Sequence, residues 1–110
     1  MLDKIHRLPS NTQLKNSRFY KTPLFAVKIA KNDQLGSRFA FLVRKKVDKR
    51  AVVRNRIRRV FRSCVEEMLG EIASGHDMLF FLERGIMEKR REELLEELKK
   101  FFEERGFIKL

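Results

Sequence analysis

The sequence predicts an α+β domain, a two-layer sandwich in which helices pack on one face of a single sheet. Short runs that alternate apolar and polar residues are typical of strands, and two long segments with apolar residues every three or four positions are typical of helices. Their order along the chain is strand, strand, helix, strand, helix. A chain of 110 residues with 43% hydrophobic content can build one modest core, so we expect one domain spanning residues 1–110.

Three runs predict the strands. Residues 24–30 and 38–44 alternate, and residues 31–36 between them have the composition of a turn, so we expect these two runs to pair as a hairpin. Residues 78–82 are wholly apolar, which is typical of a central, buried strand. The residues expected on the core face of the two alternating strands are Phe25, Val27, Ile29, Phe39, Phe41 and Val43.

Two segments have the periodicity of amphipathic helices. Residues 51–69 carry an apolar stripe from Val53 to Leu69, and residues 87–105 carry a second stripe that ends before Gly106, a residue suited to a helix C-cap. Residues 1–22 form a basic, weakly patterned N-terminal segment, in which we expect a short helix after Pro9.

Charge is divided unevenly along the chain. Residues 1–62 carry a net charge of +15 and residues 63–110 a net charge of −4, so the binding surface is expected in the first part. Nucleic acid, an anionic membrane and an acidic protein are the possible partners of such a surface. No run approaches the roughly 18 apolar residues of a membrane span, and no signal peptide is recognisable. A single cysteine fits a cytoplasmic protein. Nucleic acid is the favoured partner.

The helix predicted over residues 51–69 has its charges in an unfavourable order. Arg54, Arg58 and Arg62 are four residues apart and therefore line one face, where like charges repel. Cations crowd the N-terminal half and glutamates the C-terminal half, the reverse of what the helix dipole favours. Binding to a polyanion would offset this cost.

Two motifs in succession carry a family resemblance. A strand from Arg38 leads to Lys45-Lys46, and the next helix begins with Arg54-Asn55-Arg56. With Asp77 before an apolar strand, Arg84 and a terminal amphipathic helix, the sequence resembles the protein subunit of bacterial ribonuclease P from its first strand onward.

The resemblance implies a fold and a function. The fold would be a four-stranded sheet like that of a domain of ribosomal protein S5, with a left-handed βαβ crossover. The chain would be a non-catalytic partner of a catalytic RNA, which uses magnesium bound mainly by the RNA to remove the 5′ leader from precursor tRNA. The family usually has a longer first helix with aromatic residues that contact the leader, and the corresponding region here is shortened.

Two sites follow as hypotheses. Arginine guanidinium groups meet phosphate oxygens in pairs, so the basic helix and the loop before it would hold the catalytic RNA. The residues of this first site are Lys45, Lys46, Arg54, Asn55, Arg56, Arg58, Arg59 and Arg62. Its alternative is a solvated helix face, and Asn55 could instead cap the helix or hold the loop.

The second site is the outward face of the sheet, which would hold the leader as an extended single strand. Lys28 and Arg44 would supply charge beside small residues, and Phe19 and Tyr20 would stack on bases. The alternative is ordinary surface, or a face partly covered by the N-terminal segment.

Other residues point to no chemistry of their own. Most of the ten phenylalanines fit the core better than an RNA platform, and Cys64 fits the buried helical stripe. His6 and His76 form no zinc pattern with one cysteine, and no catalytic triad or carboxylate pair is apparent. Two other classes of protein remain open: a ribosomal-type RNA-binding module without a role in cleavage, and a basic helix for a membrane or a partner protein. We expect neither membrane binding nor a protein partner.

Overall fold

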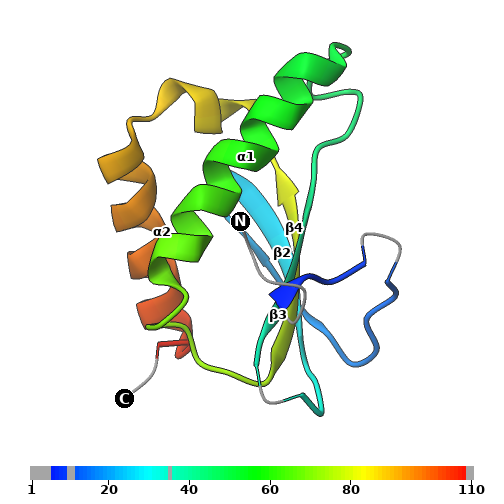
Figure 1. The fold of residues 1–110 in the computed structure, drawn as a ribbon, viewed down its shortest axis with the longest axis vertical. Helices are drawn as coiled ribbons and strands as arrows, with labels where there is room; N and C mark the ends of the chain where they lie inside the picture. The colour runs from blue at the N-terminus through cyan, green and yellow to red at the C-terminus, as the bar shows by residue number, and fades with distance from the viewer. Residues whose placement is uncertain (1–5, 10–11, 35, 109–110) are drawn as a thin grey trace.

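The fold is the α+β sandwich that the sequence predicts, seen here in a computed structural model that describes residues 6–9, 12–34 and 36–108 (Figure 1). Two helices lie on one side of a single sheet. The sheet contains β1 (Arg18–Lys21), β2 (Phe25–Lys31), β3 (Arg38–Leu42) and β4 (His76–Leu82). The helices are α1 (Ala51–Met68) and α2 (Arg91–Arg105), and a short 3-10 helix, η2 (Arg84–Glu88), precedes α2.

The strands lie in the order β1-β2-β4-β3. The predicted hairpin between β2 and β3 is therefore wrong, because β4 lies between them, antiparallel to β2 and parallel to β3. The prediction of β4 as a central strand is confirmed. Five of its seven residues are buried, and a strand with apolar side chains on both faces is best accommodated at the centre of a sheet. The order of strands in the sheet thus follows the apolar character of β4, and not the closeness of β2 and β3 in sequence.

The helices largely follow the prediction. α1 joins the parallel neighbours β3 and β4, which gives the βαβ crossover that the resemblance implies. The helix predicted over residues 87–105 is regular only from Arg91, since its first part is η2. Arg90 is the N-cap of α2, and the Glu93 side chain accepts a hydrogen bond from the Arg90 backbone N–H. Gly106 ends α2 in the left-handed conformation, as expected for a C-cap glycine.

The N-terminal segment differs most from the prediction. Residues 12–17 contain no helix, so the short helix expected after Pro9 is wrong there; residues 10–11 lie outside the described residues, as do residues 1–5. The chain instead forms β1, a four-residue edge strand that pairs with β2. Only Tyr20 of β1 is partly buried, so the strand shows no apolar alternation. Short, charged edge strands of this kind discourage pairing with other chains.

The main core lies between the sheet and the helices, and phenylalanine rings dominate it. Phe61 of α1 is 1% exposed, and its ring centroid lies 5.4 Å from that of Phe25, 5.8 Å from Phe41 and 5.0 Å from Phe80. The pairs with Phe25 and Phe41 are edge-to-face, and such pairs add to the free energy gained by burial. The expected core role of these residues is confirmed, and Cys64 lies in the same cluster. Phe61 is thus the main anchor of α1 on the sheet.

A smaller apolar cluster lies on the opposite, outer face of the sheet. Leu8 packs there against Ala40 and Leu79, with Leu14 and Phe81 alongside. The backbone N–H of Leu8 donates a hydrogen bond to the Phe39 carbonyl oxygen at 2.8 Å. The N-terminal segment therefore covers part of the outer face, which was one of the alternatives left open by the sequence.

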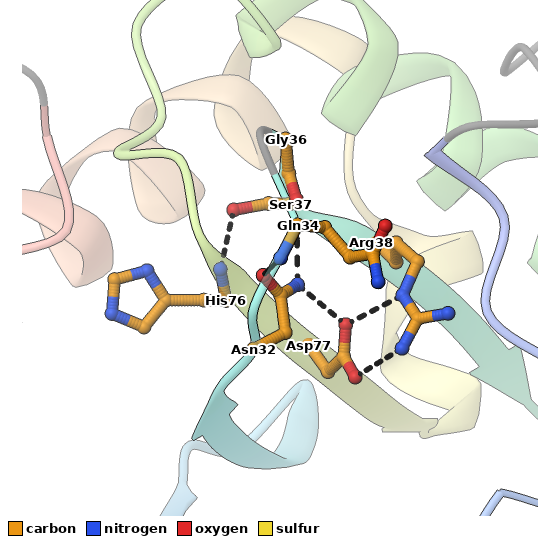
Figure 2. Close-up of polar contacts among 7 residues, drawn as sticks. All are labelled: Asn32, Gln34, Gly36, Ser37, Arg38, His76 and Asp77. Carbon is orange, nitrogen blue, oxygen red and sulfur yellow. Dashed lines mark hydrogen bonds and ion pairs between the residues drawn. The ribbon is translucent and has the colours of Figure 1, made fainter.

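A buried carboxylate ties three strands together at one end of the sheet (Figure 2). Asp77 of β4 accepts two hydrogen bonds from the Arg38 guanidinium, at 2.9 and 2.7 Å, and one from the Asn32 side chain at 2.7 Å. Burial alone would raise the pKa of Asp77, but these hydrogen bonds outweigh it and lower the pKa below its usual value. The cluster fixes where β2 ends and where β3 and β4 begin.

Candidate nucleic-acid interface

α1 has none of the charges that normally stabilise helix ends. Its first turn contains no acidic residue, its last turn no basic residue, and the side chain of its N-cap, Arg50, makes no capping hydrogen bond. A helix N-terminus without an acidic residue in its first turn, in a basic segment, favours an anionic ligand. The reversed charge order inferred from the sequence is thus a property of the folded helix.

Arg54, Arg58 and Arg62 are spaced four residues apart in α1 and form a row along one side of the helix. The guanidinium carbon of Arg62 lies 5.8 Å from the centroid of the Phe41 ring, which places this end of the row against the sheet edge. Partial burial lowers the pKa of Arg58, and the charges of Arg54 and Arg62 lower it further. The three arginines are therefore held together despite mutual repulsion, which a bound phosphate would relieve.

The other residues predicted for this site are more exposed. Arg56, Arg59, Lys45 and Lys46 all lie on the surface. At 100° per residue, Arg59 is next to the row, whereas Arg56 is about 160° away from Arg54 around the helix. A single flat surface cannot contact all of these residues, so an RNA that reached both sides would have to wrap around the start of α1.

Asn55 supports the row and does not cap the helix. It lies in the second turn, and its side-chain oxygen accepts a hydrogen bond from the Arg58 guanidinium. The capping alternative is wrong, because the N-cap position belongs to Arg50. Asn55 is exposed, so its amide nitrogen remains able to donate to a ligand.

The loop before α1 is organised around Asp48. This buried carboxylate forms ion pairs with Arg50 at 3.0 Å and with Arg84 of η2 at 3.4 Å. Arg54 donates hydrogen bonds to the backbone carbonyl oxygens of Asp48 and Lys49, each at 2.9 Å. The side-chain and backbone hydrogen bonds from Arg50 lower the pKa of Asp48 to about 2. Asp48 thereby fixes the loop that presents the lysines and the first arginine.

Asp48 should make stability depend on pH in the acid range. Because its folded pKa is depressed, its contribution is present above the unfolded value of about 3.9 and is lost as the pH falls toward 2. We expect Asp48→Asn to be less stable than the wild type at pH 7, with a difference that shrinks between about pH 5 and 2. Urea unfolding across this range measures it. Glu103→Gln, at an exposed residue of α2 without an ion pair to the described residues, is the control. A difference that does not change with pH would contradict this role.

The outer face of the sheet presents two rings and two cations. Phe19 is 59% exposed and lies directly opposite Lys28 in the β1–β2 register. The Lys28 ammonium lies 5.9 Å and the Arg44 guanidinium 5.1 Å from the centroid of the half-buried Phe81 ring. Phe19, Lys28, Arg44 and Phe81 are called the outer-face cluster below. Rings interleaved with cations suit stacked bases and their phosphates.

Two residues of this face were assigned wrongly or missed. Tyr20 points to the helices: its ring packs edge-on against Phe101 and Phe107, with Arg105 above it. The prediction that Tyr20 joins Phe19 on the outer face is wrong, because successive strand residues point to opposite faces. Phe81 was missed because β4 is apolar on both faces. Counting alternate residues from the buried Phe80 would have placed it outside.

The described residues contain neither a cluster of metal ligands nor a membrane-spanning helix. Nowhere in residues 6–9, 12–34 and 36–108 do three His, Cys, Asp or Glu side chains come together as ligands for a metal ion. No helix in this part of the chain is long and apolar enough to cross a membrane. The stripe of α1 that a membrane or partner helix would use is buried in the core.

Comparison with known proteins agrees with this arrangement. The family model described as Ribonuclease P matches residues 6–106. The sequence is 40% identical to the ribonuclease P protein component of Microcystis aeruginosa over 66% of this chain and 60% of that protein. It is 29% identical to the component from Bacillus cereus strain B4264 over 99% of this chain and 98% of that protein.

Solved structures share the fold. The ribonuclease P protein of Staphylococcus aureus superposes with a TM-score of 0.70 at 19% identity, covering 98% of this chain and 95% of that one. The ribonuclease P protein of Thermotoga maritima gives a TM-score of 0.70 at 21% identity, covering 78% and 81%. At these identities, the similarity concerns the fold alone.

Proposed function

The chain belongs to the bacterial ribonuclease P protein family, and from this membership we propose which of its surfaces meet which RNA. As the protein subunit of this endoribonuclease it binds the ribonuclease P RNA and takes part in 5′ maturation of tRNA. In the proposal, α1 and the loop before it hold the catalytic RNA, and the outer-face cluster holds the 5′ leader of precursor tRNA. The arginine row of α1, with no acidic residue in the first turn of the helix, supports the first assignment most strongly.

The α1 site would act by positioning. Arg58 and Arg62 lie one helical turn apart, close to the spacing of successive phosphates along a strand, so each guanidinium could hold one phosphate. Lys45 and Lys46 extend the positive surface from the start of α1, where Asp48 fixes the loop. Such contacts set the register of the protein on a folded RNA without reading its sequence.

The outer-face cluster would hold the leader as a single strand. Phe19 offers an exposed ring at the β1 edge, and Phe81 offers a second ring framed by Lys28 and Arg44. Stacking on rings accepts any base, which suits leaders of different sequence. Leu8 and Leu14 cover the adjacent part of this face, so they would form one wall of the path.

Magnesium is assigned to the RNA in this proposal. Mg²⁺ prefers several oxygen ligands in octahedral geometry, usually one or two carboxylates with phosphates and waters. An RNA is rich in phosphate oxygens, which are ligands of this kind, and it is therefore the proposed holder of the metal ion. The cations of the protein would instead neutralise RNA phosphates next to those that bind the metal.

Rescue of cleavage tests the proposed function. The purified chain, added to a bacterial ribonuclease P RNA at low magnesium concentration, should restore removal of the leader from precursor tRNA. A basic ribosomal protein of similar size is the control for charge neutralisation alone. Equal rescue by the control, or no rescue by the chain, would contradict the proposal and favour a generic RNA-binding module.

Loss of the exposed ring should weaken leader binding. Phe19→Ala removes one stacking surface worth about 1–3 kcal/mol, so affinity for precursor tRNA should fall by roughly 5- to 150-fold in the presence of the catalytic RNA. Affinity for mature tRNA, which has no leader, should not change. Met87→Ala, at another exposed apolar residue, is the matched control. Crosslinks from the leader to α2 but not to this face would argue against the assignment.

A further inference from the structure

A groove of about 480 Å³ lies on the helix side of the sheet, away from both sites described above. It is formed where β2 ends, where β1 and β4 begin, and where the chain leaves α2. In Figure 1, α2 ends at the bottom of the view and α1 begins at the top, so this groove and the start of α1 lie at opposite ends of the molecule. The residues used below, called the terminal groove, are Lys15, Arg18, Lys31, His76 and Phe107.

Three cations from separate parts of the chain meet in the terminal groove. Arg18 lies opposite Ile29 in the β1–β2 register, and Lys31 lies opposite His76 in the β2–β4 register. Lys15 is brought to the same place by a turn at Asn16, whose φ of 56° is in the left-handed region. Lys15, Arg18 and Lys31 are all exposed, and none forms an ion pair with a carboxylate of the described residues. An unpaired triple positive charge of this kind attracts an anion.

The opposite wall of the groove is aromatic and firmly held. The Phe107 backbone N–H donates to the Phe102 carbonyl oxygen at 2.8 Å, and the Ala73 N–H donates to the Phe107 carbonyl oxygen at 2.7 Å. The Phe107 ring packs edge-on against His76, with 5.1 Å between centroids, and against Tyr20. The wall is thus built into the fold at the point where α2 ends, and it places the partly buried rings of Phe107 and His76 beside the cations.

His76 is placed by the polar cluster at the end of the sheet (Figure 2). Its backbone N–H donates to the Ser37 hydroxyl at 3.1 Å, and its ring extends away from Asp77, on the other side of β4. The Nδ1 atom of His76 is buried and has no hydrogen-bond partner among the described residues. A buried polar atom without a partner is uncommon in native proteins, and it occurs here at the wall of a positively charged groove.

We infer that the terminal groove binds one nucleotide of an RNA strand, with its phosphate held by Lys15, Arg18 and Lys31 and its base against Phe107 and His76. Cations provide charge-assisted hydrogen bonds to phosphate oxygens, and a ring provides a stacking or edge contact that any base can use. A simple anion site would not need the aromatic wall, and an apolar ligand would not need three cations. RNA is the chosen polymer because the chain is a subunit of a ribonucleoprotein.

This contact would be independent of the proposed α1 and outer-face sites. It lies on the opposite side of the sheet from Phe19 and Lys28 and at the opposite end from the start of α1. An RNA held both there and on α1 would be fixed at two separated points, which restrains its orientation more than either contact alone. Its nucleotide could belong to the catalytic RNA or to the precursor tRNA, since both offer the same chemistry.

The first test uses the full chain and adenosine monophosphate. In a ¹H–¹⁵N NMR titration, the nucleotide should shift the resonances of Lys31, His76 and Phe107. Adenosine and inorganic phosphate should each bind more weakly, since each lacks one half of the contact. Arg18→Gln with Lys31→Gln should weaken nucleotide binding by about 10-fold or more. Lys99→Gln with Lys100→Gln, on exposed residues of α2, is the matched control. Shifts confined to α1, or no shifts at all, would overturn the inference.

The second test identifies the RNA. Each phosphate contact contributes about 0.7–0.9 to the slope of log affinity against log salt concentration. Arg18→Gln with Lys31→Gln should therefore reduce this slope by up to roughly 1.4–1.8 for the RNA that occupies the groove. If the slope falls with the catalytic RNA alone, the nucleotide belongs to the catalytic RNA. If the slope falls only when precursor tRNA is added to the holoenzyme, the nucleotide belongs to the precursor tRNA. Wild-type slopes for both RNAs would overturn the inference.

The two proposals can fail separately. Arg58→Glu with Arg62→Glu leaves the terminal groove intact, so that variant should still bind adenosine monophosphate there. If this variant also binds the catalytic RNA with wild-type affinity, the α1 assignment is wrong, while the inference about the terminal groove is unaffected. If Arg18→Gln with Lys31→Gln behaves as the wild type in both tests, the inference about the terminal groove is wrong, while the α1 assignment is unaffected.

Discussion

Arg58→Glu combined with Arg62→Glu should lower the affinity for the catalytic RNA by at least about 100-fold at moderate salt. Each guanidinium loses a charge-assisted contact worth about 1.5–3 kcal/mol, and 1.4 kcal/mol corresponds to a tenfold change in affinity. The slope of log affinity against log salt concentration should fall by about 1.8. Filter binding across a series of salt concentrations measures both quantities.

The charge change must be separated from a loss of folding. Lys99→Glu with Lys100→Glu reverses two charges on α2, far along the chain from the proposed site, and should bind nearly as the wild type does. Circular dichroism melts of both variants show whether each still folds, which matters because Arg62 contacts Phe41 of the core. Equal loss of affinity in the two variants would mean that net charge, and not the α1 row, governs binding.

Phe61→Ala should produce the largest loss of stability. Removing a fully buried phenylalanine costs about 3–5 kcal/mol, a large share of the roughly 5–15 kcal/mol that stabilises a small domain. Phe61 touches rings of β2, β3 and β4, so its loss loosens α1 from all three strands. Urea unfolding at neutral pH measures the effect, and RNA affinity should fall with the fraction folded.

The same residue type at an exposed position provides the contrast. Phe19→Ala removes an equal side chain where 59% of it is already in water, so its unfolding free energy should change by no more than about 0.5 kcal/mol. It should nevertheless weaken leader binding. If Phe61→Ala were as stable as Phe19→Ala, the packing of α1 on the sheet would have to differ from that described.

The helices and the core were predictable because their signals are local. The stripe of α1 fixes which side packs inward: Ile57, Phe61 and Cys64 are buried as the period requires. The strand faces followed in the same way, since Phe39 and Phe41 alternate with residues that point outward. In each case a single segment carries the whole pattern, and no partner has to be known.

Strand partners were not predictable from the same pattern. Alternation in β2 and β3 shows which face is apolar but not which strand lies alongside, and the nearest strand in sequence was taken wrongly. β1 gave no apolar pattern, because only Tyr20 reaches the helix layer. The outward position of Phe81 was not predicted, because β4 is apolar on both faces and shows no alternation. The terminal groove joins segments from both ends of the chain, which no local pattern can bring together.

The central position of β4 has a consequence for synthesis on the ribosome. Until His76–Leu82 has emerged, β2 and β3 have no strand between them, and within the described residues only β1 and β2 are able to pair. α1, with its arginines, emerges before the surface on which it packs is complete. Non-local pairings of this kind are slow to form and leave apolar surface exposed for longer. The nascent polypeptide therefore carries its arginine-rich helix segment ahead of its scaffold, and the sheet can be completed only after β4 has emerged.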